Sequence, residues 1–279
     1  MVKIFSDTSS LYKKGENDDI TIIPLNVTIN SNTYSEFTDI DSKKFVELIK
    51  SGYLPKSSQP AIGNYIDEYY KCSDDEILNI TVAGGLSGTY STACTAKEHS
   101  VNKDRITVFN STTLCGPHKY LVQKAVEFSK KGLTAKEIVK KLQKALESEA
   151  SFLIPSDFEY LKRGGRLSPL AAKITGKLKL FPVLKKSDDG TTLNRYSIKR
   201  GFTHAVKSIC EHLKENLLSK EAIIYISHGE DIELANKTKN IVSEFFPNNT
   251  INILSLSPAF ITQGGPSCVA IQVINKITV

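Results

Sequence analysis

Strand-like and helix-like segments alternate along the first half of this chain of 279 residues. Short apolar runs that indicate buried strands lie at residues 2–5, 20–29, 76–83 and 106–110. Helical patterns lie between or after them, at residues 41–52, 61–70, 87–98, 120–131 and 134–149. Because parallel strands need long crossover connections, which are usually helices, this alternation predicts a parallel sheet with helices on its faces.

The second half has a different pattern. Residues 181–185 and 191–198 flank Asp188-Asp189-Gly190, which is typical of a hairpin turn. A helix, a strand, a second helix and a second strand are then expected at residues 202–218, 222–227, 232–246 and 251–256. We therefore predict an α/β protein with two domains, residues 1–150 with a mostly parallel sheet and residues 151–279 with a mixed or antiparallel sheet. The absence of a low-complexity linker favours a ligand site between them.

Composition excludes several classes of function. The five cysteines are scattered, with no C-x-x-C pair, which argues against a disulfide framework or a zinc site and favours a reducing cytoplasm. No apolar run approaches the ~20 residues of a membrane span, and we expect no signal peptide. The net charge of +6 permits an acidic partner or transient contact with an anionic membrane surface. The clustered arginines with interleaved aromatic residues that are typical of nucleic-acid binding are missing.

The motifs of nucleotide and metal sites are also missing from the sequence. There is no G-x-x-x-x-G-K-[ST] segment, and no G-x-G-x-x-G segment follows a strand. Histidines and cysteines do not cluster with metal-ligand spacing. We therefore expect neither a cofactor nor a metal.

The segment from Ile80 to Tyr90 is an apolar run that breaks into glycines and restarts as a helix. A strand that enters such a turn places the free N–H groups of the next helix beside the Ser87 hydroxyl, which favours an anion. Glycines here are expected to supply positive φ angles and room for a ligand to approach the backbone. Helix capping by Ser87 is an equal alternative on this segment alone.

The same segment allows a hydrolase hypothesis. Gly85-Leu86-Ser87-Gly88-Thr89 nearly matches the nucleophile motif G-x-S-x-G, with Thr89 in place of the last glycine. A hydrolase would also need a downstream acid and histidine, and His228, at a strand end, is the only suitable histidine. A serine hydrolase of acyl substrates with Ser87 as nucleophile is therefore the alternative function.

Three other segments combine polar groups with turn residues. Lys56-Ser57-Ser58-Gln59-Pro60 is expected to be a polar loop before a helix. The segment from Tyr160 to Ser168 carries three cations around Gly164-Gly165, which suits an anion or an acidic partner, or else a helix C-terminus closed by Gly164. Gln263-Gly264-Gly265-Pro266-Ser267 is expected to be a sharp turn.

Taken in order, these segments resemble the DegV family, whose members include the fatty-acid-binding subunits of bacterial fatty acid kinase. The resemblance rests on Ser6-Asp7-Thr8-Ser9, Ile23-Pro24-Leu25, Ser57-Ser58-Gln59-Pro60, Leu86-Ser87-Gly88-Thr89-Tyr90 and Leu161-Lys162-Arg163-Gly164-Gly165-Arg166. It spans nearly the whole chain, and the last two segments are highly specific.

The resemblance implies a two-domain α/β protein that holds a long-chain fatty acid in an apolar tunnel and is not itself an enzyme. A separate ATP-dependent kinase would convert the presented carboxylate to an acyl phosphate for phospholipid synthesis. By the same resemblance, Ser57, Ser87 with Gly88, and Gln263 would hold the carboxylate, and Arg166 and Arg200 would face the phosphate or the kinase.

The chain departs from the family pattern at two of these positions. Ser57 stands where the family has threonine, which keeps the hydroxyl. Gln263 stands where the family has histidine, and a neutral amide donates a hydrogen bond but does not become a cation. A different acid or acyl ligand therefore stays open.

Overall fold

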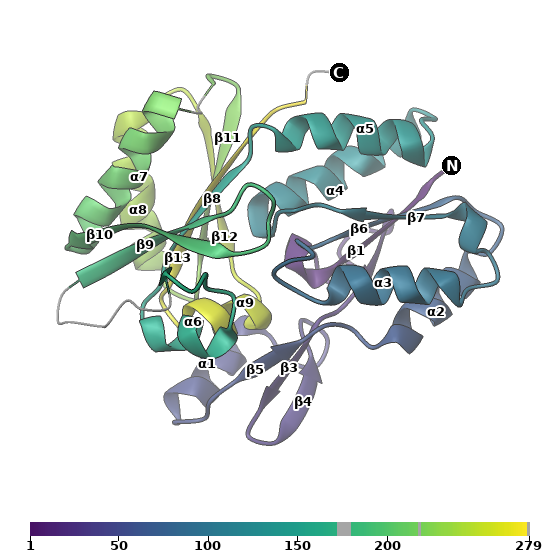
Figure 1. The fold of residues 1–279 in the computed structure, drawn as a ribbon, viewed down its shortest axis with the longest axis horizontal. Helices are drawn as coiled ribbons and strands as arrows, with labels where there is room; N and C mark the ends of the chain where they lie inside the picture. The colour runs from purple at the N-terminus through teal and green to yellow at the C-terminus, as the bar shows by residue number, and fades with distance from the viewer. Residues whose placement is uncertain (172–179, 217–218, 278–279) are drawn as a thin grey trace.

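The computed structural model describes residues 1–171, 180–216 and 219–277. Its first part contains a four-stranded sheet in the order β2-β1-β6-β7, in which all neighbours are parallel (Figure 1). The strands are β1 (Lys3–Asp7), β2 (Ile20–Ile23), β6 (Ile77–Thr81) and β7 (Ile106–Asn110). The parallel sheet predicted from the strand–helix alternation is confirmed.

Helices cover both faces of this parallel sheet. They are α2 (Ile62–Lys71), α3 (Thr89–Glu98), α4 (Cys115–Lys130) and α5 (Ala135–Leu146). Phe5 packs in the core beneath α2 and α3, whereas Ile4, its neighbour in the strand, packs in the core beneath α4 and α5. The alternation of side chains along β1 therefore gives the sheet two apolar faces.

The second large sheet has six strands in the order β10-β9-β8-β13-β11-β12, and only β11 and β12 are parallel neighbours. Its strands are β8 (Ala150–Ile154), β9 (Leu180–Lys186), β10 (Leu193–Arg200), β11 (Ala222–His228), β12 (Thr250–Ser255) and β13 (Val269–Asn275). The expected mixed sheet and the hairpin around Gly190 are confirmed. The domain boundary at residue 150 stays a prediction.

This mixed sheet is also covered on both faces. Helices α7 (Phe202–Asn216) and α8 (Ile232–Phe245) pack on one face, where Ile224 and Ile226 point. Ile223 and Tyr225 point the other way, into the core that contains α4 and α5. Helices α4 and α5 therefore lie between the two large sheets and pack against both. The last two residues of the helix predicted at 202–218 lie outside the described residues.

A small antiparallel sheet, β4-β3-β5, lies below the two large ones (Figure 1). Its strands are β3 (Asn26–Ile29), β4 (Asn32–Ser35) and β5 (Lys56–Ser58), and the short helices η1 (Thr8–Ser10) and η2 (Lys103–Arg105) complete the first part of the chain. The single strand expected at residues 20–29 was wrong. Pro24 has no N–H for a sheet ladder, and the chain divides there into β2 and β3.

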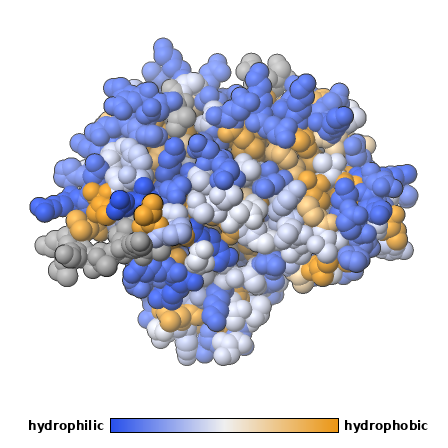
Figure 2. Space-filling view, in the orientation of Figure 1, coloured by the Kyte–Doolittle hydropathy of each residue, from blue (hydrophilic) through white to orange (hydrophobic). Residues whose placement is uncertain are grey.

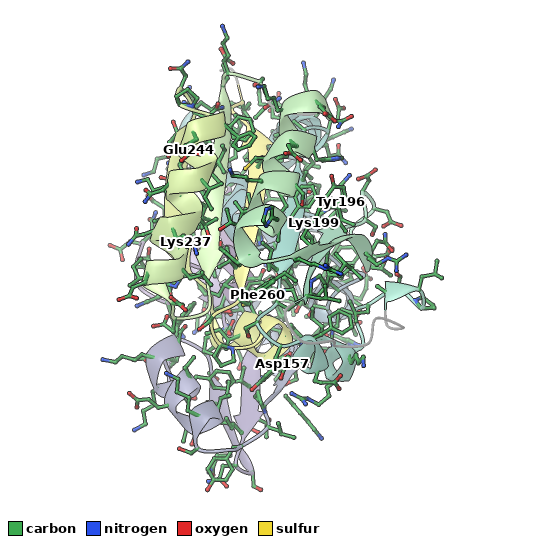
Figure 3. All side chains as sticks on the ribbon, turned by 90° about the vertical axis from the view of Figure 1, so that its left-hand side faces the viewer. Asp157, Tyr196, Lys199, Lys237, Glu244 and Phe260 are labelled. Carbon is green, nitrogen blue, oxygen red and sulfur yellow. The ribbon has the colours of Figure 1, made fainter. Side chains whose placement is uncertain are left out.

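Three helices join this small sheet to the rest of the molecule. They are α1 (Ser42–Lys50), α6 (Phe158–Gly164) and α9 (Pro258–Gly264). Asp41 caps α1 by accepting the Lys44 N–H at 2.8 Å, as its sequence predicts. Figure 3 shows Phe260, on α9, between the mixed sheet above and the small sheet below.

Several elements differ from their sequence patterns. Ser57 and Ser58 belong to strand β5 and not to a loop. Helix α4 begins five residues before the predicted start, with Pro117 in its first turn, where a missing N–H is tolerated. Tyr65 and Tyr69 are buried as expected, but Tyr70 is 68% exposed.

The surface shown in Figure 2 is mostly hydrophilic, and the cysteines are not paired in disulfides. Hydrophilic residues cover most of the face in Figure 2, and apolar residues form small separate groups on it. All five cysteines have free thiols. Within the described ranges, no helix is long and apolar enough to cross a membrane, and no group of His, Cys, Asp or Glu side chains is suited to a metal ion.

Candidate functional site

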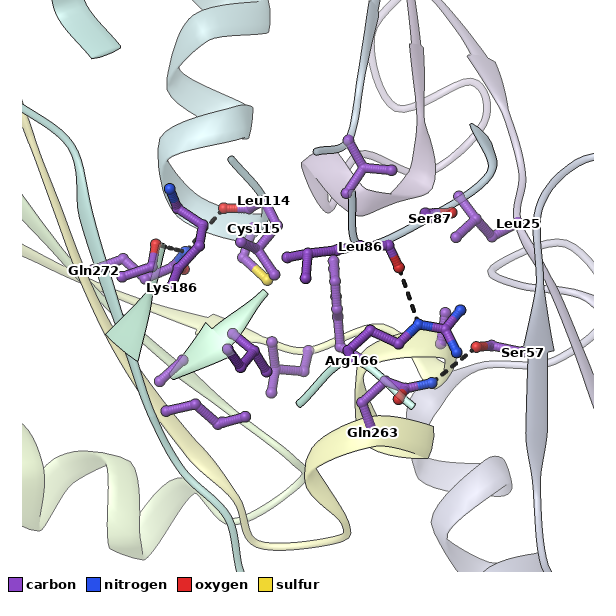
Figure 4. A pocket seen from close by; sticks show the side chains of 18 of the residues that line it. Leu25, Ser57, Leu86, Ser87, Leu114, Cys115, Arg166, Lys186, Gln263 and Gln272 are labelled. Atoms are coloured by element: carbon purple, nitrogen blue, oxygen red, sulfur yellow. Dashed lines mark hydrogen bonds between the residues drawn. The ribbon is translucent and has the colours of Figure 1, made fainter. Parts of the chain in front are cut away.

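A pocket lies where β5, α9, the β6–α3 loop and the inner face of the mixed sheet meet. Its cavity volume is about 110 Å³, which is room for several water molecules. Most of its wall is apolar, with side chains that include Leu25, Val82, Leu86, Leu114, Phe152, Leu153, Leu193, Leu256 and Phe260. Ser57, Ser87, Arg166 and Gln263 form a polar group on one side (Figure 4).

Ser57 and Gln263 contact each other directly, although 206 residues separate them in the sequence. The Gln263 Nε2 amide donates to Ser57 Oγ at 3.1 Å. Since the Ser57 oxygen accepts this bond, the Ser57 proton is free to be donated into the pocket. The neutral Gln263 amide thus orients Ser57 as a donor.

Gly164 makes room for the Gln263 side chain at the end of α6. A Cβ built on Gly164 would lie 1.8 Å from Gln263 Oε1, so a larger residue there would displace the Gln263 side chain. The Gln263 oxygen is buried and has no hydrogen-bond partner among the described residues. The Gln263 side-chain oxygen is therefore able to accept a further hydrogen bond.

Ser87 lies two residues before the first residue of helix α3, next to the N-cap Gly88. Its Oγ accepts the Thr89 N–H at 3.3 Å and lies 2.8 Å from Thr89 Oγ1. When Thr89 Oγ1 donates across that contact, the Ser87 proton is available to an acceptor in the pocket. Ser87 thus combines the two alternatives left by the sequence, a capping contact and a position in the pocket wall, near the positive end of the helix dipole.

Arg166 lies on the same side of the pocket as Ser57 and Gln263 (Figure 4). Its Nε donates to the Leu86 carbonyl at 3.0 Å, and its Nη1 donates to the Gly164 carbonyl. Burial lowers the pKa of the guanidinium, but arginine keeps its charge in proteins. The polar group thus contains a half-buried cation that also fixes the loop before Ser87.

The glycines before Ser87 have a different role from the expected one. Neither Gly84 nor Gly85 has a positive φ. A Cβ on Gly85 would lie 2.3 Å from Thr191 Cα, so the tip of the β9–β10 hairpin occupies the space expected for a ligand. The expectation was wrong because the close approach here is made by another part of the chain.

Two other predicted site residues do not line the pocket. A Cβ on Gly88 would lie 2.8 Å from Gln59 Oε1, so the Gln59 side chain covers Gly88. Arg200 is exposed at the end of β10. The structure thus brings Ser57, Ser87, Arg166 and Gln263 together at one pocket and places Gly88 and Arg200 outside its described lining.

A buried polar cluster behind the pocket was not predicted as functional. Glu36 accepts the Ala259 N–H at 2.8 Å at the start of α9, and also accepts from Thr8 Oγ1. Burial, with a smaller contribution from the nearby Asp7, raises the pKa of Glu36 to about 7. Glu36 therefore connects the small sheet to the helix that carries Gln263. Its sequence signal was weak, since a lone glutamate near the end of a short strand is typically solvated.

The residues of the hydrolase hypothesis do not meet. The described hydrogen-bond partner of the Ser87 hydroxyl is Thr89. His228 Nδ1 accepts the Asp231 N–H at 3.1 Å, near the start of α8. No histidine lines the part of the pocket that the structure describes.

The family profile and similar sequences point to the same family. The sequence profile described as "Uncharacterised protein, DegV family" matches residues 1–276. A DegV domain-containing protein of Staphylococcus aureus is 30% identical over 275 residues, which are 97% of this chain and 96% of that protein.

Two solved structures are similar to this one over nearly the whole chain. DegV of Bacillus subtilis, described as a fatty acid binding protein, has a TM-score of 0.85 at 26% identity and covers 99% of both chains. A fatty acid binding DegV family protein of Streptococcus agalactiae has a TM-score of 0.88 at 24% identity, again covering 99% of both chains.

Proposed function

This chain belongs to the DegV family, and we propose that it binds a long-chain fatty acid in the pocket lined by Ser57, Ser87, Arg166 and Gln263. The observation that carries the proposal is a mostly apolar pocket in which Ser57, Ser87, Arg166 and Gln263 form a group of hydrogen-bond donors on one side. Such a site suits a ligand with an acyl tail and a small anionic head. The Bacillus subtilis relative, described as fatty acid binding, supports the same reading.

Affinity and orientation come from different parts of the ligand. Each buried methylene contributes roughly 0.8 kcal/mol, so the tail supplies most of the affinity. The carboxylate needs donors, because a buried charge without partners is very costly. The Ser57 and Ser87 hydroxyls donate, and Arg166 supplies an opposite charge.

In this proposal the protein presents the fatty acid and does not transform it. A separate ATP-dependent kinase would phosphorylate the carboxylate for phospholipid synthesis, with Arg166 near the phosphate and the exposed Arg200 facing the kinase. Residues 1–150 would supply Ser57 and Ser87, and residues 151–279 would supply Arg166 and Gln263. The head-group site would thus lie between the two domains. The net charge of +6 also suits transient contact with an anionic membrane.

Native protein purified from a bacterial host is expected to retain a fatty acid. Mass spectrometry of an organic extract measures this directly, and the delipidated protein should take up added oleate or palmitate. An extract without lipid, together with no uptake, would rule the proposal out. Labelling of Ser87 by a fluorophosphonate probe would favour the hydrolase instead.

Removing one hydroxyl of the head-group site should weaken fatty-acid binding. A hydrogen bond to a charged group contributes about 1.5–3 kcal/mol, so Ser57→Ala or Ser87→Ala should cost roughly 10- to 150-fold in affinity. Gln263→Ala should cost less than either, since Gln263 acts through Ser57. Titration calorimetry with the acid and its methyl ester tests this. Equal losses for both ligands would mean that these residues only shape the fold.

Arg166 should contribute mainly through its charge. Arg166→Gln is expected to weaken binding of the acid about tenfold, whereas Arg166→Lys keeps the cation and most of the affinity. Methyl ester binding serves as the control and should change little in both variants. Equal losses in the Lys and Gln variants would instead assign the effect to the lost bond between Nε and the Leu86 carbonyl.

A further inference from the structure

A buried ion pair lies on the side of the pocket away from the carboxylate donors. Lys186 Nζ is 2.9 Å from Glu149 Oε2, and each side chain is only 3% exposed. Lys186 lines the pocket together with Gln272, and Figure 4 shows both across the pocket from Ser57 and Gln263. The head-group chemistry proposed above makes no use of this charged group.

Gln272, next to Lys186, has no spare donor. Its Nε2 donates to the Leu114 carbonyl at 2.9 Å and to Ser151 Oγ at 2.8 Å, which uses both amide protons. Its Oε1 accepts the Gly116 N–H at 3.3 Å. Gln272 therefore supports the surrounding backbone and offers little to a ligand.

Glu149 is also fully engaged. It accepts from Thr113 Oγ1 at 2.9 Å, from Ser151 Oγ, and from Lys186. Its carboxylate neutralises the Lys186 ammonium, so the pair adds no net charge to the pocket.

Lys186 differs from both neighbours in its unused donor. Its ammonium carries three N–H groups, one directed to Glu149 and one to the Ser187 carbonyl at 3.1 Å. In the described parts of the chain the third has no acceptor. A plain methylene tail against Lys186 would leave this buried donor unpaired, which is costly.

On the premise of the proposed function, we propose that the preferred ligand is an oxygenated fatty acid. Its hydroxyl or keto oxygen, remote from the carboxylate, accepts the third N–H of Lys186. A neutral oxygen fits better than a second carboxylate, because Glu149 already balances the ammonium and another anion would leave a buried net charge. The site therefore recognises an acyl ligand at two points, its carboxylate and an oxygen in the distal half of its chain.

The test compares stearate with a set of its monohydroxylated derivatives, which carry the hydroxyl at successive positions in the distal half of the chain. Titration calorimetry on delipidated protein should find at least one derivative that binds about tenfold tighter than stearate. The double variant Lys186→Met with Glu149→Gln removes both charges together and should lose this preference. Lys185→Met is the matched control on the same strand, outside the pocket lining, and should keep it.

The outcomes separate this inference from the proposed function. Equal binding of stearate and every derivative by the wild-type protein overturns the inference and leaves fatty-acid binding intact. A double variant that keeps the preference for a hydroxylated acid also overturns the inference. So does a double variant whose only change is that it binds longer unsubstituted fatty acids, since the Lys186–Glu149 pair would then limit chain length. Binding of neither class of ligand overturns the proposed function and the inference with it.

Discussion

Lys186→Met alone is expected to lower the free energy of unfolding by about 3–5 kcal/mol, because it leaves the Glu149 carboxylate buried without its cation. Both side chains are 3% exposed, so water does little to screen the remaining charge. Two hydroxyl donors, Thr113 and Ser151, stay on the carboxylate but carry no charge. Urea unfolding at neutral pH measures the loss.

The double variant Lys186→Met with Glu149→Gln should recover most of that stability. Replacing a whole buried ion pair by neutral groups of similar size is often neutral or stabilising, whereas removing one partner is not. The coupling energy between the two substitutions, measured in a double-mutant cycle, should therefore be larger than that of an exposed ion pair, which is about 1 kcal/mol or less. A Lys186→Met variant as stable as the wild type would show that water reaches Glu149.

Stability should fall as the pH rises through the titration of Glu36. Burial raises its pKa from 4.5 in the unfolded chain to about 7 in the folded protein, so the folded state binds the extra proton between those values. The contribution is fully present below pH 4.5 and is lost as the pH passes 7. It amounts to about 3 kcal/mol, from 1.36 kcal/mol per pKa unit.

Glu36→Gln removes this titration while keeping the local hydrogen bonds. A glutamine oxygen accepts the Ala259 N–H as Glu36 does, and its amide donates to Thr8 Oγ1, which reverses the direction of the bond that Thr8 donates to Glu36. We expect the difference in unfolding free energy between pH 5 and pH 8 to shift by about 2.5 kcal/mol relative to the wild type. Comparing the two proteins cancels other groups, such as buried His118, whose pKa burial lowers. An unchanged difference would mean that Glu36 stays ionised.

Local patterns predicted most regular elements because each pattern depends on the burial or the hydrogen bonding of neighbouring residues. The alternating faces of β11 and the capping box of α5, with Thr134 and Glu137, are properties of a few adjacent residues. Strand β5 was missed because Ser57 and Ser58 lack the β-branched or aromatic side chains that mark strands. Strand β13 and helix α9 were also not predicted. Strand β13 is a nearly continuous apolar run without a period, and α9 is only seven residues long.

The candidate site depended on contacts that no local pattern contains. The bond between Ser57 and Gln263 joins an edge strand to a helix near the chain end, and only the family resemblance placed the two together. Arg166 was predicted to face the phosphate or the kinase, but its position in the pocket lining was not predicted. Gly165, with φ of 71°, turns the chain after α6, and the guanidinium reaches back to the Leu86 carbonyl. Side-chain direction after a turn is set by tertiary packing.

The placement of α4 and α5 between the two large sheets governs how a lipid would leave. Leu121, Ile138 and Tyr225 belong to one core shared by both halves of the molecule. A hinge motion that parted the sheets would expose this core to water, so under the proposed function the fatty acid would leave by sliding lengthwise. Each added methylene, at roughly 0.8 kcal/mol, would then slow release about fourfold. Long acyl chains would leave mainly when a partner draws them out.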